Sequence, residues 1–371
     1  MPPSISDTEN HLRADSTAAQ SASRKNRRRE LLRHLSGTWV MQRLKQVNLS
    51  AVPSWLGAQV STASRFEHSV GVGKLSLLVS DGTEHDQLLL TAAASLHDVG
   101  AGPFPHISDE LMKEMLGFTH EGAVGFAFES SPVRDSLVLD EYGLDVMEVA
   151  SILDGQHRLS PLLRGFPDLD NADNIRRFMM TIPGRPLGVA SYRPSEIASC
   201  MSLESEEQEI PGDLLKRWRR DYQKVYSYVW NDGLNMVCWT MLGRALRILR
   251  EDLTPRFFRL TNREAFQLIR LRLPELAKGL RKKEFKILLD REYNELGGEA
   301  RRLSEPSNLG DIEDMLCKET GLEKWSLGLT VDRPSITEES GHWRVYLVSH
   351  KGNDESVALL EDMLSGSEPL D

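Results

Sequence analysis

Apolar side chains recur at intervals of three and four residues through most of the chain, which predicts a mainly α-helical protein. The first such segment runs from Leu31 to Val47, and Pro53 lies beyond its end. Shorter helical segments follow, separated by Gly, Pro, Ser or Asp. They are expected near residues 65–80, 86–99, 107–116, 120–130, 145–153 and 171–181.

Two longer helices are predicted after these segments. In the first, Trp218, Tyr222, Val225 and Val229 form an apolar stripe. The second begins after the break at residues 231–233 and carries a similar stripe. We interpret these stripes as helix–helix core and not as a cofactor-binding face.

The C-terminal third has a different pattern. Leu327, Leu329 and Val331 alternate with small or polar residues, and Val345 and Leu347 do so later. Alternation of this kind predicts two strands of a small antiparallel sheet. We therefore divide the chain into a disordered tail (1–28), a helical domain (29–270) and a small α+β subdomain (271–371).

Composition limits the class of protein. The chain has 371 residues, of which 40% are hydrophobic and 27% charged, as in ordinary globular proteins. Its 45 basic and 55 acidic residues give a net charge of −10, which argues against a protein that binds nucleic acid over its whole surface. No apolar run approaches the roughly 18 residues that span a bilayer, and the first 30 residues lack the apolar core of a secretory signal. The 3 cysteines are far apart and odd in number, which excludes a disulfide framework. We expect a soluble cytoplasmic protein without membrane contacts.

Five of the ten histidines lie between residues 68 and 120, and four of them are candidate site residues: His68, His97, His106 and His120. Histidine is common at catalytic sites and is the most common metal ligand. His97 and Asp98 follow the apolar run 88–96, so we expect both at a buried helix end. A carboxylate buried there without a partner is costly, and a bound cation would supply the missing charge.

The motifs around these histidines occur in a definite order. They are Arg65-Phe66-Glu67-His68, Leu96-His97-Asp98-Val99-Gly100, Gly102-Pro103-Phe104-Pro105-His106, His120-Glu121 and Asn171-Ala172-Asp173. This series resembles the HD-domain metal-dependent phosphohydrolases, and within them the deoxynucleoside triphosphate triphosphohydrolases. The resemblance covers roughly residues 31–270. It implies an HD-domain helical bundle for the domain over residues 29–270.

Carried over residue by residue, the resemblance implies four metal ligands: His68, His97, Asp98 and Asp173. Two imidazoles and two carboxylates suit a divalent cation such as Mn²⁺, Fe²⁺, Mg²⁺, Co²⁺, Ni²⁺ or Zn²⁺. Four protein ligands leave coordination positions open for water and a phosphate oxygen.

The resemblance also implies catalytic roles for His106, Asp109 and His120. His106 would activate the water or protonate the leaving oxygen, and Asp109 would hold its ring. His120 would contact the phosphate. Arg65 would clamp a phosphate with its forked guanidinium.

An alternative for Arg65 is an ion pair with Glu67 or Glu121 at the surface. Other positions depart from the family pattern. Ala101 stands where the triphosphohydrolase branch has a histidine. The branch has Lys, Tyr and Asp after its last metal ligand, and the corresponding residues here are Asn174, Arg177 and Thr181. We expect Asn174 and Arg177 to contact the substrate, since Arg177 could restore positive charge near the phosphates.

These residues predict a metal-dependent phosphohydrolase that cleaves a phosphoester of a nucleotide. A (deoxy)nucleoside triphosphate, with release of triphosphate, is the form implied by the resemblance, as is a homo-oligomer. The alternative is a catalytically weakened, nucleotide-binding regulatory protein, which Ala101 and the changes after Asp173 suggest. Nucleic-acid binding through the basic residues Arg27–Arg29 is disfavoured by the net charge.

Overall fold

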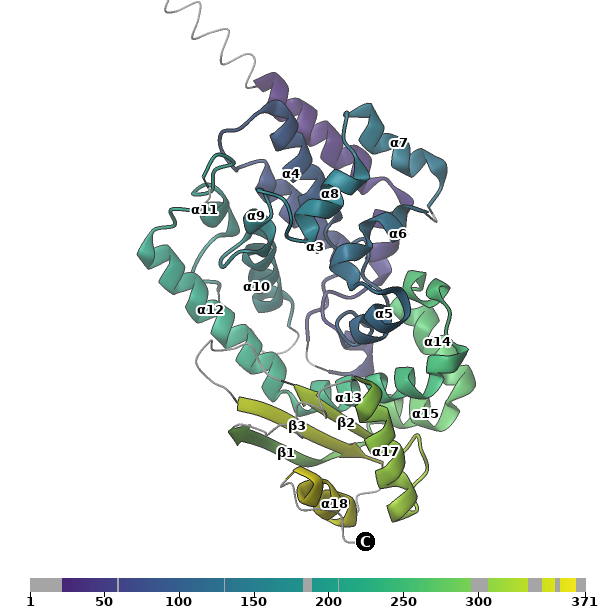
Figure 1. The fold of residues 1–371 in the computed structure, drawn as a ribbon. Coiled ribbons are helices and arrows are strands. Elements are labelled where there is room, and N and C mark those ends of the chain that lie inside the picture. Colours follow the sequence, from purple (N-terminus) through teal and green to yellow (C-terminus); the bar gives the residue numbers. More distant parts are fainter. Residues whose placement is uncertain are drawn as a thin grey trace, which may run out of the picture.

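A computed structural model gives the structure of residues 22–58, 60–129, 131–182, 189–205, 207–294, 306–332, 342–350 and 354–364. Most of these residues form a helical body, which occupies the upper and middle parts of Figure 1. Its first half contains a helix over residues 22–36, α2 (Trp39–Arg43), α3 (Arg65–Ser76), α4 (Glu84–Leu96), α5 (Asp109–Leu116), α6 (Val124–Glu129), α7 (Val133–Glu141), α8 (Val146–Leu153) and α9 (Pro161–Arg164). Its second half contains α10 (Leu169–Thr181), α11 (Pro194–Ala198), α12 (Gly212–Asn231), α13 (Gly233–Leu249), α14 (Asn262–Arg272) and α15 (Pro274–Lys282). Short 3₁₀ helices connect them: η1 (Leu44–Gln46), η2 (Ser54–Leu56), η3 (His120–Ala123), η4 (Arg250–Asp252) and η5 (Pro255–Arg259).

The chain after α15 forms a three-stranded antiparallel sheet. Its strands are β1 (Lys286–Asn294), β2 (Leu327–Asp332) and β3 (His342–Ser349), with β3 in the centre. One face of the sheet packs on α13, and the other is covered by α17 (Pro306–Thr320) and α18 (Asp354–Leu364) (Figure 1). The mainly α fold with a small α+β C-terminal region is therefore confirmed.

Strand β2 shows why the alternating pattern was informative. Leu327 and Leu329 belong to the apolar cluster with α17, whereas Thr330 on the opposite face donates a hydrogen bond to Thr240 of α13 at 2.9 Å. The pattern did not reveal β1, because the pairing of β1 with β3 shifts register between Ile287 and Leu289. Such an irregularity interrupts the two-residue period on which strand prediction depends.

The N-terminal boundary needs correction. Residues 22–28, predicted as part of the tail, begin the first helix. Arg28 is buried there, and its guanidinium donates hydrogen bonds to the Thr91 hydroxyl and to the Ser76 carbonyl. Polar acceptors inside the body thus stabilise a segment whose composition is that of a solvated tail. Residues 1–21 lie outside the described residues.

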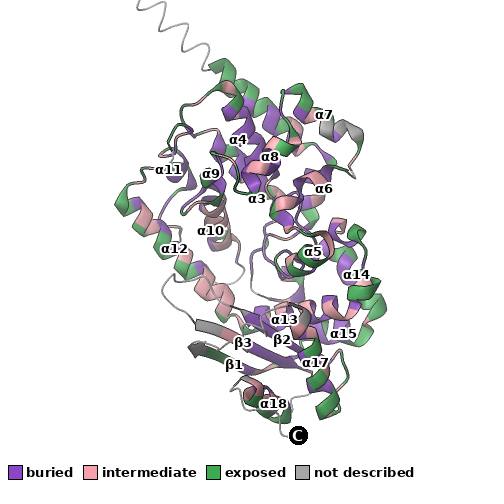
Figure 2. Cartoon of the chain, viewed as in Figure 1, coloured by how far each residue is buried: buried purple, intermediate pink, exposed green. Residues whose placement is uncertain are grey.

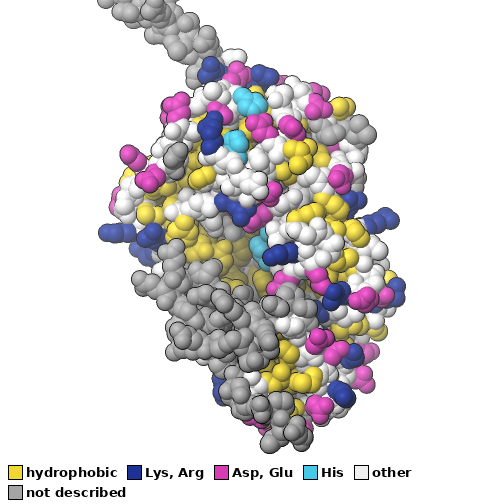
Figure 3. Space-filling model, viewed as in Figure 1, with side chains coloured by type: hydrophobic (Ala, Val, Ile, Leu, Met, Phe, Trp, Pro, Cys, Tyr) yellow, Lys and Arg dark blue, Asp and Glu magenta, His cyan; other side chains and the backbone are white. Residues whose placement is uncertain are grey.

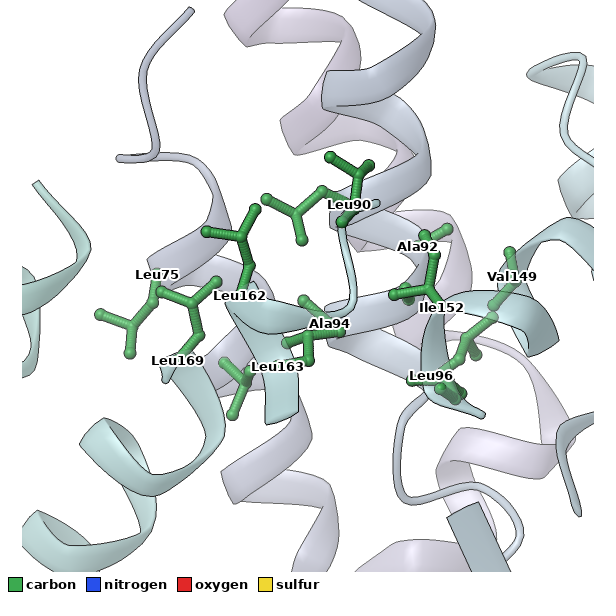
Figure 4. Packing of buried hydrophobic residues seen from close by; sticks show 14 of the residues in the cluster. Leu75, Leu90, Ala92, Ala94, Leu96, Val149, Ile152, Leu162, Leu163 and Leu169 are labelled. Atoms are coloured by element: carbon green, nitrogen blue, oxygen red, sulfur yellow. The ribbon is translucent and has the colours of Figure 1, made fainter. Parts of the chain in front are cut away.

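Helix α4 lies at the centre of the body. Every residue from Leu88 to Leu96 is buried (Figure 2), as expected for a helix that is apolar on all sides. Figure 4 shows its leucines and alanines among Val149 and Ile152 of α8 and the leucines of α9. Because His97 and Asp98 directly follow α4, this packing holds both residues at the bottom of the core.

Among the described residues, no helix combines the length and apolar character needed to cross a bilayer.

Candidate metal centre and active-site cavity

A cavity of about 500 Å³ opens beneath the end of α4. It is lined by residues of α3, α5, α10, α12 and α13 and, at its C-terminal side, by α17 and β2. Figure 3 shows a hollow in the middle of this face with hydrophobic side chains on its floor and a histidine at its edge. Most of the residues singled out from the sequence lie in or beside this cavity.

One end of the cavity holds four side chains, and the donor atoms of three of them, His68, His97 and Asp170, converge. His68 Nε2 lies 3.2 Å from His97 Nε2 and 2.7 Å from Asp170 Oδ1. Asp98 Oδ2 lies 3.5 Å from His97 Nε2 and 4.0 Å from His68 Nε2. Ligand atoms bound at about 2.0–2.2 Å from one ion lie about 3 Å apart. The atoms of His68, His97 and Asp170 therefore lie close enough to one another to bind a single cation, and Asp98 Oδ2 lies beside the two imidazoles.

Local sequence explains how the helices bring these residues together. Ser64 and Glu67 form a capping box at the start of α3, with Ser64 Oγ accepting from the Glu67 N–H. His68 follows one residue later and faces the end of α4. Asp168 caps α10 by accepting from the Asn171 N–H at 2.6 Å, and this places Asp170 in the first turn.

Contacts on the far side of each imidazole orient the two rings. His97 Nδ1 donates to the Ala94 carbonyl at 2.9 Å, and His68 Nδ1 donates to Asp173 Oδ2 at 2.8 Å. Because both Nδ1 atoms are engaged by these contacts, the two Nε2 atoms face each other and remain available for a cation. Contacts of this kind fix the tautomer of metal-binding histidines.

Asp173 therefore does not occupy the predicted ligand position. Its carboxylate lies against Nδ1 of His68, on the opposite side of the ring from His97, and Asp170 of the same helix supplies the converging oxygen instead. Residues three apart on a helix share a face, so the sequence pattern did not distinguish these two carboxylates. Gly71 makes the Asp173 contact possible, because a Cβ there would collide with the Asp173 carboxylate.

The electrostatics of this end suit a divalent cation. Asp98 is buried, and its Oδ2 has no hydrogen-bond partner. Burial lowers the pKa of His68, but its hydrogen bonds to Asp170 and Asp173 outweigh burial and raise that pKa to about 10. Burial raises the pKa of Asp98, but the charges of Arg65 and the two histidines outweigh it and hold that pKa well below its usual range. The carboxylates thus favour positive charge beside the Nε2 atoms of His68 and His97. The mixed set of nitrogen and oxygen donors fits Mn²⁺, Fe²⁺ or a similar ion.

A second histidine pair lies beside the first. Asp109 Oδ2 accepts from His120 Nδ1 at 2.8 Å and lies 3.3 Å from His106 Nδ1. His120 is buried, whereas the His106 side chain is 53% exposed. Burial lowers the pKa of His120, but the Asp109 carboxylate outweighs burial and raises it.

The glycine- and proline-rich turn before α5 presents these residues to the cavity. Phe104 and His106 both have left-handed backbone conformations, with φ of 54° and 65°. Such conformations are uncommon for residues other than glycine and store local strain. Gly100 has its own requirement, since a Cβ there would collide with the His120 carbonyl. The turn and η3 are thus packed directly against each other.

Comparison with known proteins agrees with this geometry. Residues 65–172 match the HD domain family. Residues 65–172 form an HD domain.

Two named relatives match part of this chain in sequence. The deoxynucleoside triphosphate triphosphohydrolase SAMHD1 homolog of Dictyostelium discoideum is 28% identical over 136 residues, and deoxynucleoside triphosphate triphosphohydrolase SAMHD1 of Gallus gallus is 36% identical over 101 residues. The matches cover 32% and 23% of this chain, but they span only 25% and 16% of those proteins.

Solved structures resemble the chain over most of its length. A phosphohydrolase from Bacteroides thetaiotaomicron aligns with a TM-score of 0.59 and 15% identity, over 87% of this chain and 95% of that one. A hypothetical protein from Aquifex aeolicus aligns with a TM-score of 0.60 and 14% identity, over 90% and 95%. At this identity the likeness establishes a shared fold.

Within the HD domain, Arg65 lies between the two histidine pairs. Its guanidinium pairs with Asp98 Oδ1 and lies 3.2 Å from His106 Nε2. Glu67 and Glu121, the two alternative ion-pair partners of Arg65 considered from the sequence, have other partners. Glu67 caps α3, and Glu121 pairs with Arg164 at 2.8 Å. Arg65 lines the cavity, and its Nε is buried without a partner.

Because Asp170 and not Asp173 supplies the converging oxygen, the positions expected to contact the substrate are also counted from Asp170. The positions one, four and eight residues after Asp170 are Asn171, Asn174 and Phe178, and all three line the cavity. Arg177 instead pairs with Asp173, with Nε–Oδ2 at 2.5 Å, and is not among the cavity residues. The predicted phosphate contact of Arg177 is therefore replaced by a role in holding Asp173. Asn174 keeps its predicted place on the cavity wall.

Ala101 and helix α12 complete the account of the predicted residues. Ala101 is fully buried and is not part of the cavity wall. The predicted stripe on α12 packs in the core, since Trp218 and Val225 are buried in it and Tyr222 and Val229 pack against it. Tyr226 and Trp230, which were not singled out from the sequence, line the cavity together with Val229. An available signal was the run of aromatic residues at every fourth position from Trp218 to Trp230.

Proposed function

We propose that this protein is a metal-dependent phosphohydrolase that cleaves a phosphoester of a nucleotide. The proposal is supported by the HD domain, by the named relatives and by the two histidine pairs in one cavity. The phosphorus would lie between the pairs, next to Arg65.

One observation carries most of this proposal. Two imidazole Nε2 atoms lie 3.2 Å apart while both Nδ1 atoms donate to other groups. The carboxylates around His68 favour positive charge between the two Nε2 atoms, and a bound cation would supply that charge in place of the proton on His68. The unpartnered oxygen of Asp98 next to the pair strengthens the same conclusion.

The proposed ligands are His68, His97, Asp98 and Asp170. A divalent cation held by them would supply Lewis-acid charge neutralisation at the phosphoryl group and lower the pKa of a water molecule. Asp173 and the Ala94 carbonyl would keep the two rings in position.

The remaining residues would handle the phosphate and the protons. Arg65 would donate hydrogen bonds to phosphoryl oxygens from its unpartnered Nε and from Nη2. His120, kept protonated by Asp109, would donate to the phosphate. His106, half exposed beside Asp109, would exchange protons with water and with the leaving oxygen.

The relatives' names suggest a finer form of this reaction. Both relatives are named as deoxynucleoside triphosphate triphosphohydrolases, so a (deoxy)nucleoside triphosphate with release of triphosphate is one candidate. The homo-oligomer expected from the resemblance is part of the same proposal, and light scattering on the purified protein would test it.

Turnover tests the proposal directly. The purified protein, supplied in turn with each candidate metal, would be given a panel of dNTPs, NTPs and nucleoside monophosphates while phosphate, pyrophosphate and triphosphate are measured. We expect metal-dependent product release that the His97→Ala/Asp98→Ala variant lacks. Nucleotide binding without turnover under every metal would contradict an enzyme and favour a regulatory protein.

A further inference from the structure

Away from the metal end, three neighbouring helices contribute uncharged side chains to the cavity wall. Helix α10 presents Asn174 and Phe178, α12 presents Tyr226 and Trp230, and α13 presents Trp239. Asn174 and Phe178 follow Asp170 at successive intervals of four residues, so one face of α10 changes from acidic to amide to aromatic. The indole rings of Trp230 and Trp239 lie 5.7 Å apart, which makes a continuous aromatic surface.

The cations of the cavity are already engaged. Within the described part of the chain, three Arg and no Lys side chains line it: Arg65, Arg164 and Arg247. They pair with Asp98, Glu121 and Glu313 respectively. The Arg247 pair is tight, because Glu313 is fully buried and also accepts from Arg244.

The same cavity contains several acidic groups besides the proposed ligands. Glu110 and Glu121 both line it. A triphosphate brings two more phosphoryl groups than a monophosphate, and each would need charge-assisted donors beyond the metal. Burying phosphate charge next to carboxylates without such donors is costly. An uncharged aromatic group would instead gain from contact with the Trp230–Trp239 surface.

Tyr226 lines the cavity one helical turn before Trp230. Its ring packs on Tyr222 with centroids 4.5 Å apart, and its hydroxyl forms no hydrogen bond within the described residues. Burial, helped by Tyr222 and Asp170, raises the pKa of Tyr226, so the phenol remains a hydrogen-bond donor. It is placed to donate to the part of a substrate that joins a phosphoryl group to an aromatic group.

We infer that the substrate carries a single phosphoryl group on the hydroxyl of an uncharged alcohol that bears an aromatic group, as a nucleoside monophosphate does, with the base on the Trp230–Trp239 surface. This inference rests on the proposed function and names its substrate class. In the reaction the oxygen of water bonds to phosphorus and the ester P–O bond breaks. The leaving oxygen takes a proton, so the products are a nucleoside and inorganic phosphate.

The charge argument is tested by adding a cation to the wall. The kcat/KM values for a nucleoside monophosphate and for the matching triphosphate would be compared in the wild type, in Asn174→Lys and in Met180→Lys. Asn174 Oδ1 is buried without a partner, whereas Met180 is 66% exposed on the same helix and outside the cavity. We expect the wild type to prefer the monophosphate at least about tenfold, since one charge-assisted hydrogen bond is worth about that factor. Asn174→Lys should shift the ratio toward the triphosphate by about the same factor, and Met180→Lys should leave it unchanged.

The outcomes separate this inference from the function on which it rests. Release of triphosphate with a higher kcat/KM than release of phosphate from the monophosphate overturns the inference and leaves the phosphohydrolase intact. Absence of turnover with every ester and metal overturns the proposed function, and the inference with it.

The aromatic surface has its own test. Ribose 5-phosphate carries the same phosphoryl group without a base, so the preference for a nucleoside monophosphate over it measures base binding. Trp230→Leu should reduce that preference about tenfold or more, because base–aromatic stacking is worth about 1–3 kcal/mol. The control is Trp325→Leu, a half-buried Trp that packs on Phe285 and His350 outside the cavity. An equal effect of both substitutions, or no effect of Trp230→Leu, would contradict base binding at this surface.

Discussion

The two histidine pairs of the cavity use opposite sides of the imidazole ring. In the first pair, His68 and His97, both Nδ1 atoms are bound from behind and the Nε2 atoms meet at 3.2 Å. In the second pair, His106 and His120, both Nδ1 atoms face one oxygen of Asp109. The residue types are the same in the two pairs. The nitrogen that the surrounding groups leave available decides whether a pair is suited to hold a cation or to move protons.

Accessibility differs between the pairs as well. His68 is buried among carboxylates on both sides, whereas His106 is half exposed. A ligand benefits from a rigid and dry position, while a group that exchanges protons needs contact with water. We therefore expect substitutions in the first pair to reduce metal binding and substitutions in the second pair to reduce the rate of the reaction.

The largest effect is expected from substitution of the carboxylates near His68, Asp170 and Asp173. Asp170→Ala removes a proposed ligand, so both the bound metal and the activity should be lost. Activity should fall by about 1000-fold or more, because several kcal/mol of charge stabilisation are lost. Asp173→Ala removes an orienting contact and should weaken metal affinity by about 10–100-fold. Metal analysis and titration of both variants check this order. A larger loss of metal from Asp173→Ala would restore Asp173 as the ligand.

The next effect concerns the second pair. His120→Gln should leave the metal content unchanged while kcat falls by about 10²–10⁴-fold, since it removes a positioned proton donor. Metal analysis and steady-state kinetics on the same preparation measure both quantities. Tyr142→Phe is a suitable control, because that hydroxyl bonds to His34 away from the cavity. Loss of metal from His120→Gln would mean that the two pairs do not have separate roles.

The smallest effect is a shift in pH dependence. Asp109 raises the pKa of His120, so the protonated form persists to higher pH than in an isolated histidine. If the reaction needs protonated His120, activity is present below this raised pKa and is lost as the pH rises through it. In Asp109→Asn the raising charge is gone while burial still lowers the pKa, so the alkaline limb of kcat should move to lower pH. An unchanged limb would show that another group controls it.

Much of the helical order could be predicted from the sequence. The predicted segment over 65–80 corresponds to α3, the one over 86–99 to α4, and the one over 171–181 to α10. Capping residues and breakers act locally, and for this reason they can be recognised without tertiary information. The start of the first helix was missed because the buried acceptors of Arg28 belong to distant segments. Strand β1 was missed because its irregular pairing with β3 disturbs the alternation.

The candidate site was predictable in its composition and less so in its connections. The motifs placed His68, His97, Asp98, His106 and His120 around one cavity, as the structure does. The stripe on α12 packs in the core as predicted, but the cavity residues Tyr226 and Trp230 were not singled out, because an apolar spacing is the same whether it faces another helix or a cavity. Arg177 was taken as a phosphate contact, but its closest carboxylate is Asp173, one turn back on the same helix.

The sequence by itself determined the helical order, the HD motif and the kinds of side chain available for chemistry, because these depend on residues close together in the chain. The tertiary structure decided which of two carboxylates, three residues apart on α10, meets the His68 and His97 nitrogens. It also decided which nitrogen of each ring is left available. Both choices depend on how α3, α4 and α10 are rotated against one another, and that rotation is set by core packing over the whole body.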